Sequence, residues 1–357
     1  MRHIRGRVVA VDSLADFDRR LSSGARTLAG WHLRNLDLRE RGEELRAAQV
    51  GGALFLGCTL LPEDEVTARA RGAVVSPHRS QPPARTALYS GRELYDTADY
   101  ADSLDARLYA WSQRPRDRDA SLAQALHDHA IDEALGAYVR DRHLVGVMGG
   151  HALARGSAAY ADAARLGHAL GATYVVATGG GPGAMEAANL GAALSRRPLA
   201  DLDAPLDLLA AAPSYRPDVG GWVATALAVL DGVPDPADSL GIPTWHYGHE
   251  PTNPFATAIA KYFRNATREA ILLQICDAGI VFLPGAAGTV QEIFQDACEN
   301  YYADVSSLAP MVLVGRDYWT RTLPVWPLLI ALAEERPMAP HVHLVDSLEE
   351  AVAIVAV

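Results

Sequence analysis

The amino-acid sequence predicts an α/β protein, with a Rossmann-like parallel sheet flanked by helices and a smaller N-terminal α/β extension. Two observations lead to this prediction. From about residue 119 onward, short apolar runs alternate with helical patterns, which is typical of strands buried on both faces of a parallel sheet. Three of these runs end in glycine-rich turns that pass directly into helical patterns. We therefore expect an N-terminal extension over residues 1–118 and a larger domain over residues 119–357.

The composition limits the classes of partner. The chain has 357 residues, a net charge of −11 and a pI of about 5.5. This acidic balance argues against non-specific binding to nucleic acid or to an anionic membrane. The three cysteines form no CxxC motif, and no apolar run approaches the roughly 18 residues of a membrane span. We expect a soluble cytoplasmic protein without a signal peptide, a disulfide framework or a structural metal site.

The N-terminal extension contains two predicted strands and a short helix. Residues 51–61 (GGALFLGCTLL) and 73–77 (AVVSP) read as buried strands, and residues 62–72 read as a helix that begins at Pro62. The polar segment 111–121 (WSQRPRDRDAS) reads as a linker. No internal repeat is visible in the sequence.

The larger domain reads as a regular alternation of strands and helices. The predicted strands are 143–150, 173–181, 206–213, 239–245, 278–285, 310–315 and 341–346, with helical patterns between them and over 347–357. One long helix is expected over residues 253–275. The polar stripe of this helix is expected to carry Lys261, Arg264, Asn265 and Arg268.

The three glycine-rich turns contain Gly149 and Gly150, residues 179–183, and Gly285 with Gly288. Glycine lets backbone N–H groups approach a ligand closely, and a helix N-terminus favours a phosphate. Each turn alone is explained by a tight connection between a strand and a helix. Three of them at one edge of one sheet favour a phosphate or nucleotide pocket.

The helix after the third turn begins with Thr289-Val290-Gln291-Glu292, which fits a capping box. Thr289 would then cap the helix, and the Glu292 side chain would reach back to it. Glu292 also lies one turn from the glycine loop, so its carboxylate can face a ligand there. The two roles are compatible.

These residues resemble a known family. The segments TGGGPGAMEAANLGA and TREAILLQICDAGIVFLPGAAGTVQE are similar to the paired motifs of the Lonely guy (LOG) family, often labelled lysine-decarboxylase-like. The resemblance covers roughly residues 120–357. It implies a phosphoribohydrolase, which cleaves the N-glycosidic bond of a nucleoside 5′-monophosphate to free base and ribose 5-phosphate. It also implies a homodimer or larger homo-oligomer, without a cofactor or metal.

The resemblance also implies roles for particular residues. The family arginine and glutamate match Arg268 and Glu292, which become the expected catalytic residues. Glu292 would stabilise positive charge on the ribose, and Arg268 would hold substrate or pair with Glu292. The expected substrate- and phosphate-binding residues are Gly149, Gly150, Thr178, Gly179, Gly180, Gly181, Gly183, Pro284, Gly285, Gly288 and Thr289. The group that protonates the leaving base is not identified.

Three positions depart from the family pattern. Ala286 stands in place of the second glycine of the hallmark, Gln291 in place of a glutamate, and Glu269 in place of a lysine. These departures question cytokinin specificity more than the glycosidase chemistry. With its N-terminal extension, the chain looks more like the long bacterial nucleotide 5′-monophosphate nucleosidases. By this analogy the extension would regulate the site.

Three other functions are weighed against this one. A pyridoxal-phosphate decarboxylase needs a Schiff-base lysine, and the only lysine, Lys261, is expected in the middle of a helix. A non-catalytic carrier of a nucleotide or phosphorylated cofactor is the main alternative. A dinucleotide dehydrogenase rests only on the loose G-x-G-x-x-A pattern that Gly179 begins.

Two polar clusters rank lower. His246, His249 and Glu250 read as a polar loop beside the pocket rather than as a metal site, because no third ligand at a suitable spacing is evident. His151 and Arg155 follow the first glycine turn, and they are either neighbours of the ligand or part of a helix surface.

Overall fold

The computed structural model describes residues 9–76, 85–115, 118–246 and 250–356. The chain divides into two compact units. Residues 1–86 and 114–130 form the first unit, and residues 87–113 and 131–357 form the second. Residues 87–113, assigned above to the extension, thus belong to the second unit, and helix α6 (Arg118–Val139) begins in one unit and ends in the other. The functional division near residue 118 stays a prediction.

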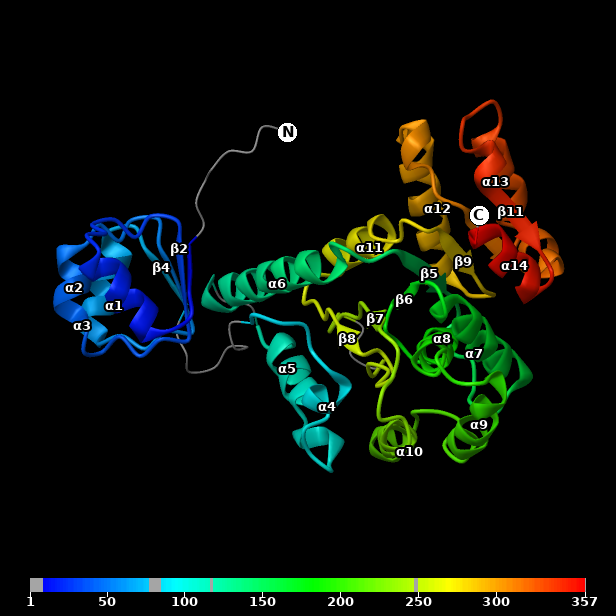
Figure 1. Ribbon diagram of the computed structural model, residues 1–357, viewed down its shortest axis with the longest axis horizontal. Coiled ribbons are helices and arrows are strands. Elements are labelled where there is room, and N and C mark those ends of the chain that lie inside the picture. Colours follow the sequence, from blue (N-terminus) through cyan, green and yellow to red (C-terminus); the bar gives the residue numbers. More distant parts are fainter. Residues whose placement is uncertain (1–8, 77–84, 116–117, 247–249, 357) are drawn as a thin grey trace. The chain divides into compact units, whose positions relative to one another are not determined.

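The first unit contains a four-stranded parallel sheet, whose strands follow one another in chain order (Figure 1). The strands are β1 (Val9–Val11), β2 (Trp31–Arg34), β3 (Leu54–Leu56) and β4 (Val74–Ser76). The helices between them are α1 (Leu14–Ser22), α2 (Gly42–Ala47) and α3 (Pro62–Ala70). The two predicted strands and the helix that begins at Pro62 are confirmed. A buried apolar core, which includes Phe17, Leu33 and Phe55, holds this unit together.

This unit has a structural repeat, although no internal repeat was expected from the sequence. The paired residues Val9 and Trp31 are 22 positions apart, and Leu54 and Val74 are 20 positions apart. A glycine with positive φ precedes β2, β3 and β4 in turn: Gly30, Gly52 and Gly72. The N–H of Gly30 donates to the carbonyl of Gly52, whose own N–H donates to that of Gly72. Stacked left-handed turns, which glycine adopts without strain, therefore begin each repeat.

The second unit contains a seven-stranded sheet in the order β11-β10-β9-β5-β6-β7-β8, and every pairing is parallel. The strands are β5 (Leu144–Met148), β6 (Val175–Thr178), β7 (Ser239–Gly241), β8 (Ala258–Ile259), β9 (Ile280–Phe282), β10 (Met311–Val314) and β11 (Val342–Val345). Together with the first unit, this sheet confirms the predicted α/β class, with Rossmann-like parallel sheets flanked by helices.

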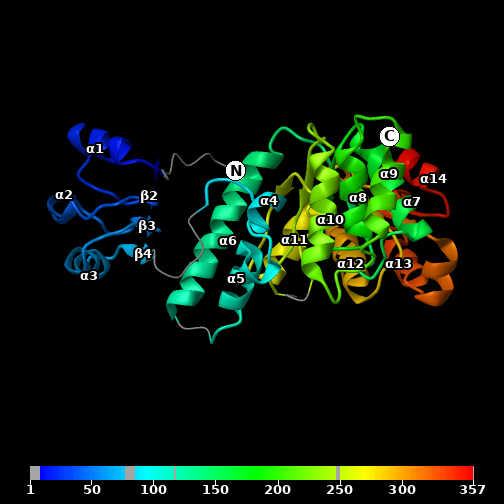
Figure 2. The same cartoon turned by 90° about the horizontal axis from the view of Figure 1, so that it is seen from below.

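Helices cover both faces of this sheet (Figures 1 and 2). They are α4 (Gly91–Leu94), α5 (Leu104–Ser112), α7 (Ala158–Gly171), α8 (Ala184–Ala193), α9 (Asp203–Ala210), α10 (Val219–Asp231), α11 (Asn265–Gln274), α12 (Ala287–Tyr302), α13 (Trp326–Ala333) and α14 (Leu348–Val355). Along β5, Val145 and Val147 join the core that contains α7 and α8, whereas Leu144 and Met148 join the core that contains α11 and α12. Successive side chains point to opposite faces, so a strand covered on both sides must be apolar throughout.

The predicted strand over 206–213 is wrong, because residues 206–210 belong to α9 and the residues after Ala210 form no strand. Leu202 and Leu209 are buried, and Leu206 packs against the same core. These leucines are four and three positions apart, which is the spacing of a helix face. A short apolar run does not distinguish a strand from a helix, and here the packing of one face against this shared core selected the helix.

The predicted helix over 253–275 is also largely wrong, because only Asn265–Gln274 is helical. The preceding residues are not helical and contain β8, which pairs with β7, and Ile259 forms a bridge with Tyr89. Tertiary pairing with a segment far away in the sequence thus overrode the local pattern. Lys261 and Arg264 precede the helix and do not share a stripe with Arg268.

Lys261 lies in the interior of the second unit, just after β8. Its Nζ donates to Asp105 Oδ1 at 2.5 Å and to Thr252 Oγ1 at 2.7 Å, and it lies 5.0 Å from the centre of the Trp245 ring. Burial lowers the pKa of Lys261, while the Asp105 carboxylate opposes the shift. The lysine therefore ties α5 to the extended segment around β8.

Within the described residues, no helix is long and apolar enough to cross a membrane.

Candidate functional site

The candidate site lies at the switch point of the seven-stranded sheet. The chain continues from β5 to β6 on one side and returns later to β9 on the other side, so β9, β5 and β6 are neighbours. Because the strands are parallel, their carboxyl ends lie at one edge of the sheet. The three glycine turns follow these three strands, and they meet where doubly wound sheets commonly bind ligands.

Hydrogen bonds join the three turns to one another. The N–H of Gly150 donates to the carbonyl of Pro284 at 3.1 Å, and the N–H of Ala184 donates to the carbonyl of Gly150 at 3.1 Å. Gly183 has a φ of 76°, and a Cβ at this position would lie 2.4 Å from the oxygen of Gly150. Glycine is therefore required where the first and second turns touch.

A cavity of about 220 Å³ opens at this junction. It is lined by Gly149, Gly150, His151, Gly179, Gly181, Met185, Pro243, Thr244, Glu250, Pro251, Arg268, Glu269, Ala286, Ala287, Gly288, Thr289 and Glu292. The structure thus brings together residues from the three glycine turns, the expected catalytic pair and the loop after β7.

The N-terminus of α12 forms one wall of the cavity. The helix begins at Ala287, and Ala286 occupies the N-cap position, where an alanine side chain cannot accept a hydrogen bond. The predicted capping box is wrong, because the helix begins earlier than expected and Thr289 is its third residue. The amides of Ala287, Gly288 and Thr289 have no partner within the helix, so this end is suited to an anion.

Two glycines at this helix end have different roles. A Cβ at Gly285 would lie 2.1 Å from Thr289 Oγ1, so Gly285 is needed for packing within the turn. At Gly288, no heavy atom of the described residues lies within 4 Å of an added Cβ. Gly288 therefore faces open space in the cavity. Ala286 has a φ of −107°, outside the positive range that favours glycine.

Arg268 lies between two buried carboxyl groups. Its Nη2 is 3.1 Å from Glu269 Oε1, and its Nη1 is 3.2 Å from Glu269 Oε2. Its Nη1 also lies 3.8 Å from Glu292 Oε1. The three residues are each less than 10% exposed, so this cluster holds two acidic side chains and one basic side chain away from water.

The pKa of Glu292 is raised to about 8. Burial is the largest cause, because a carboxylate loses its hydration there; Arg268 opposes the shift and Glu269 adds to it. Glu292 can therefore exchange a proton close to neutral pH. A strongly perturbed carboxyl in a cavity is typical of functional sites.

The remaining predicted residues lie beside the cavity wall. Thr178 is fully buried and its Oγ1 donates to Asn189 Oδ1, while Gly180 packs on Pro243. Pro284 and Gly285 accept hydrogen bonds from Gly150 and from the Tyr318 hydroxyl. Gly183 contacts the first turn, as described above. These residues shape the turns that surround the cavity.

Several lining residues had no role expected from the sequence. Glu269 was noted only as a departure from a family pattern, yet it binds both terminal nitrogens of Arg268. Its adjacency to Arg268 was the available signal. Glu250 belongs to the predicted polar loop and reaches the cavity, whereas His249 lies outside the described residues. His151 was weighed as a ligand neighbour, and it lines the cavity.

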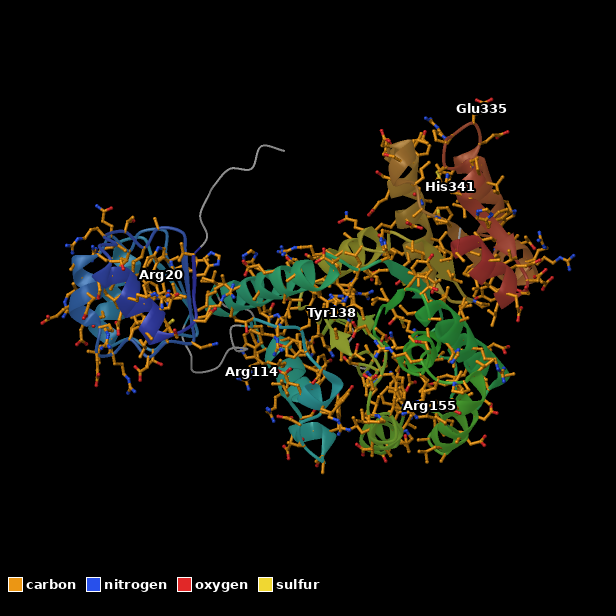
Figure 3. All side chains as sticks on the ribbon, viewed as in Figure 1. Arg20, Arg114, Tyr138, Arg155, Glu335 and His341 are labelled. Atoms are coloured by element: carbon orange, nitrogen blue, oxygen red, sulfur yellow. The ribbon has the colours of Figure 1, made fainter. Side chains whose placement is uncertain are left out.

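Arg155 lies outside this cavity, on an adjoining one of about 350 Å³. Its side chain is buried between α8 and α10, where it forms an ion pair with Glu186 and donates to the carbonyl of Trp222 (Figure 3). Burial raises the pKa of Glu186, and Arg155 opposes this shift. The Arg155 guanidinium therefore joins α8 to α10.

The position of Lys261 corrects the reason given against a decarboxylase. The lysine lies in a loop after a strand, not within a helix, but its Nζ is occupied by Asp105 and Thr252. It does not line the cavity at the glycine turns. A Schiff base at that cavity therefore cannot involve Lys261.

No protein-family model matches the sequence, and no curated protein matches it. Among solved structures, the chain is similar to the molybdenum cofactor carrier protein of Chlamydomonas reinhardtii, with 16% identity and a TM-score of 0.39. It is also similar to the molybdenum cofactor binding protein of Rippkaea orientalis, with 17% identity and a TM-score of 0.36. A third similar structure is the structural-genomics target TM1055, with 19% identity and a TM-score of 0.38. Each match covers 60% of this chain and between 96% and 98% of the other. The likeness concerns the fold alone.

Proposed function

We propose that this protein is a phosphoribohydrolase of the LOG type, which hydrolyses nucleoside 5′-monophosphates to free base and ribose 5-phosphate. One observation carries the proposal: the buried carboxyl of Glu292 lies in the same cavity as the uncapped N-terminus of α12. The first feature suits a sugar that gains positive charge, and the second suits a phosphate. A phosphorylated ribose presents both groups.

The geometry suggests how the substrate lies. The 5′-phosphate would accept hydrogen bonds from the amides of Gly288 and Thr289. Glu292 follows on the same helix, and one helical turn of about 5 Å leaves room for the ribose between phosphate and carboxyl. Arg268, fixed by Glu269, would orient Glu292 and the substrate.

In the proposed reaction, the ionised form of Glu292 is the active one. Cleavage of the bond between C1′ and the base gives the ribose oxocarbenium character, which a nearby carboxylate stabilises. Water then adds to C1′ and releases a proton to the same carboxylate. A pKa of about 8 makes Glu292 a stronger base than an exposed glutamate.

The test is incubation with the common nucleoside monophosphates, with free base and ribose 5-phosphate measured by chromatography. Glu292→Gln and Arg268→Ala should each abolish release, by at least about 100-fold. The matched controls are Glu299→Gln, on the same helix, and Arg264→Ala, next to α11, because neither residue lines the cavity. Full activity in Glu292→Gln would refute the role of this carboxyl.

A non-catalytic carrier of a phosphorylated ligand is the second candidate. The observation that favours it is the pairing of Arg268 with Glu269, because the positive charge of the arginine is already offset before a ligand arrives. A carrier would bind nucleoside monophosphates or ribose 5-phosphate in calorimetry without releasing base. Turnover by the wild-type protein would exclude a purely carrying role.

A further inference from the structure

We propose that His151, oriented by Glu250, donates the proton that the leaving base needs. The inference rests on the proposed function, since it names a second reacting group in the same site. The chemistry requires such a group: a purine or pyrimidine anion leaves poorly unless a ring atom is protonated as the bond to C1′ breaks. Glu292 does not supply this proton, because in the proposed reaction it is ionised and stabilises the positive charge on the ribose.

His151 is held in place at the junction of two glycine turns. It directly follows Gly150, whose N–H and carbonyl bind the other two turns. A Cβ at Gly183 would lie 2.8 Å from the carbonyl carbon and oxygen of His151, so the two backbones are in close contact. The position of the histidine backbone is therefore determined by the same turns that form the cavity.

The imidazole of His151 has a carboxylate partner. Its Nδ1 lies 3.6 Å from Glu250 Oε1, and both side chains line the cavity. A carboxylate beside Nδ1 favours a proton on that nitrogen and sets the orientation of the ring. In the described part of the chain, Nε2 of His151 has no hydrogen-bond partner, which leaves it available to a ligand. The distance is long for a hydrogen bond, as is common before substrate binds.

The other ionisable groups of the cavity are less suited to this task. Arg268 does not release a proton in proteins, and Glu269 is bound to both of its terminal nitrogens. Glu292 lies on α12, beside the helix end that would hold the phosphate. His151 projects from the turn after β5, and it also lines the adjoining cavity. The base would lie toward that side.

The proposed step conserves atoms and charge. The bond between C1′ and the base nitrogen breaks, and its electron pair goes to the base. The proton on Nε2 of the His151 imidazolium moves to a ring nitrogen of the base. Water adds to C1′ and gives its proton to the Glu292 carboxylate. Exchange with solvent returns both groups to their starting protonation states, so one nucleotide and one water yield base and ribose 5-phosphate.

The test compares two leaving groups on the full chain. One substrate is the nucleoside monophosphate that the wild type hydrolyses fastest, and the other is 4-nitrophenyl β-D-ribofuranoside 5-phosphate, whose 4-nitrophenolate leaves without a proton. His151→Gln should lower kcat about 100-fold on the nucleotide and less than about twofold on the nitrophenyl substrate. Glu250→Gln should show the same pattern more weakly, whereas Glu292→Gln should lose activity on both substrates.

The matched control is His143→Gln, which changes an exposed histidine at the other end of β5. It should leave both substrates unaffected. Equal losses on both substrates in His151→Gln, or no loss on either, would overturn the role of His151 while leaving the proposed function in place. Failure of the wild type to release any base would overturn the proposed function, and this inference with it.

Discussion

The guanidinium of Arg268 binds Glu269 through two nitrogens and lies 3.8 Å from Glu292, so one arginine serves two buried acids. Glu269, the closer acid, offsets most of the positive charge of the guanidinium. Glu292 is left with a weak stabilising contact in a place where its carboxylate is poorly hydrated, and this raises its pKa to about 8. This relationship leads to the first two predictions.

The first prediction concerns pH and activity. With 4-nitrophenyl β-D-ribofuranoside 5-phosphate, which needs no acid, kcat/KM should rise with pH and level off above an apparent pKa near 8, because only ionised Glu292 is active. Glu269→Gln should move this midpoint to lower pH, since Glu269 is one cause of the raised pKa. The measurement is a pH profile from about pH 5 to 10. A profile that is flat over this range would contradict the assignment.

The second prediction concerns pH and stability. A carboxyl whose pKa is raised in the folded state stays protonated there while the unfolded chain loses its proton. For Glu292, stability should therefore fall as pH rises from about 4.5 to about 8. Glu292→Gln should be equally stable at pH 4 and more stable at pH 8, by at most about 5 kcal/mol.

Urea unfolding of both proteins at the two pH values is the measurement. Asp296, whose pKa burial also raises to about 8, gives an independent comparison, because Asp296→Asn should shift stability in the same direction without touching the cavity. If Glu292→Gln is less stable than the wild type at pH 8, the ionised Glu292 carboxylate does not destabilise the folded protein, and the raised pKa is contradicted.

The third prediction concerns the phosphate. Gly288→Ala adds a methyl group to open space in the cavity, and alanine is the better helix former, so the fold should be retained. The methyl group should crowd an anion at this helix end and weaken ribose 5-phosphate binding by about tenfold or more, or about 1.4 kcal/mol. Isothermal titration calorimetry measures the effect.

The matched control is Gly136→Ala in α6, where an added Cβ likewise has no heavy atom of the described residues within 4 Å. This residue does not line the cavity. It should leave ribose 5-phosphate binding unchanged. Unimpaired binding in Gly288→Ala would exclude a phosphate at the N-terminus of α12.

The fourth prediction concerns Lys261. Removing one member of a buried ion pair leaves the other uncompensated, so Lys261→Met should cost about 3–5 kcal/mol of stability. Lys261→Met combined with Asp105→Asn should recover much of this loss, because no buried charge is then unpaired. Thermal unfolding with a double-mutant cycle measures the coupling. If the double variant retains base release, Lys261 has a structural role; a loss of turnover at unchanged stability would contradict that role.

Much of the fold was predictable from local patterns. The strands that end at the glycine turns are buried on both faces, so they read as short apolar runs followed by Gly149, Gly179 or Gly285. The repeat of the first unit was missed because its spacing varies and because equivalent buried positions carry different residue types, such as Leu33 and Phe55. The strand predicted over 206–213 was wrong because a run of about four to eight apolar residues suits either a strand or a helix.

The candidate site was predictable only in part. Glycine turns and an acid near a helix start can be read locally, and they pointed to Glu292 and Gly288. Whether α12 began at Ala287 or later depended on how the turn packs, because Gly285 must fit against Thr289. Glu250 and Glu269 were noted in the sequence, but their contacts with His151 and Arg268 depend on side-chain positions that the sequence does not determine.

The sequence by itself determined which segments are apolar on both faces and where glycine permits tight backbone turns. It also determined which acidic and basic residues lie near those turns. All of these are properties of a few neighbouring residues. Only the tertiary structure decided that β9, β5 and β6 are adjacent, that residues 253–264 are not helical, and that Arg268 lies closer to Glu269 than to Glu292. Strand order and charge pairing depend on contacts between distant parts of the chain, whose free energy no local pattern records.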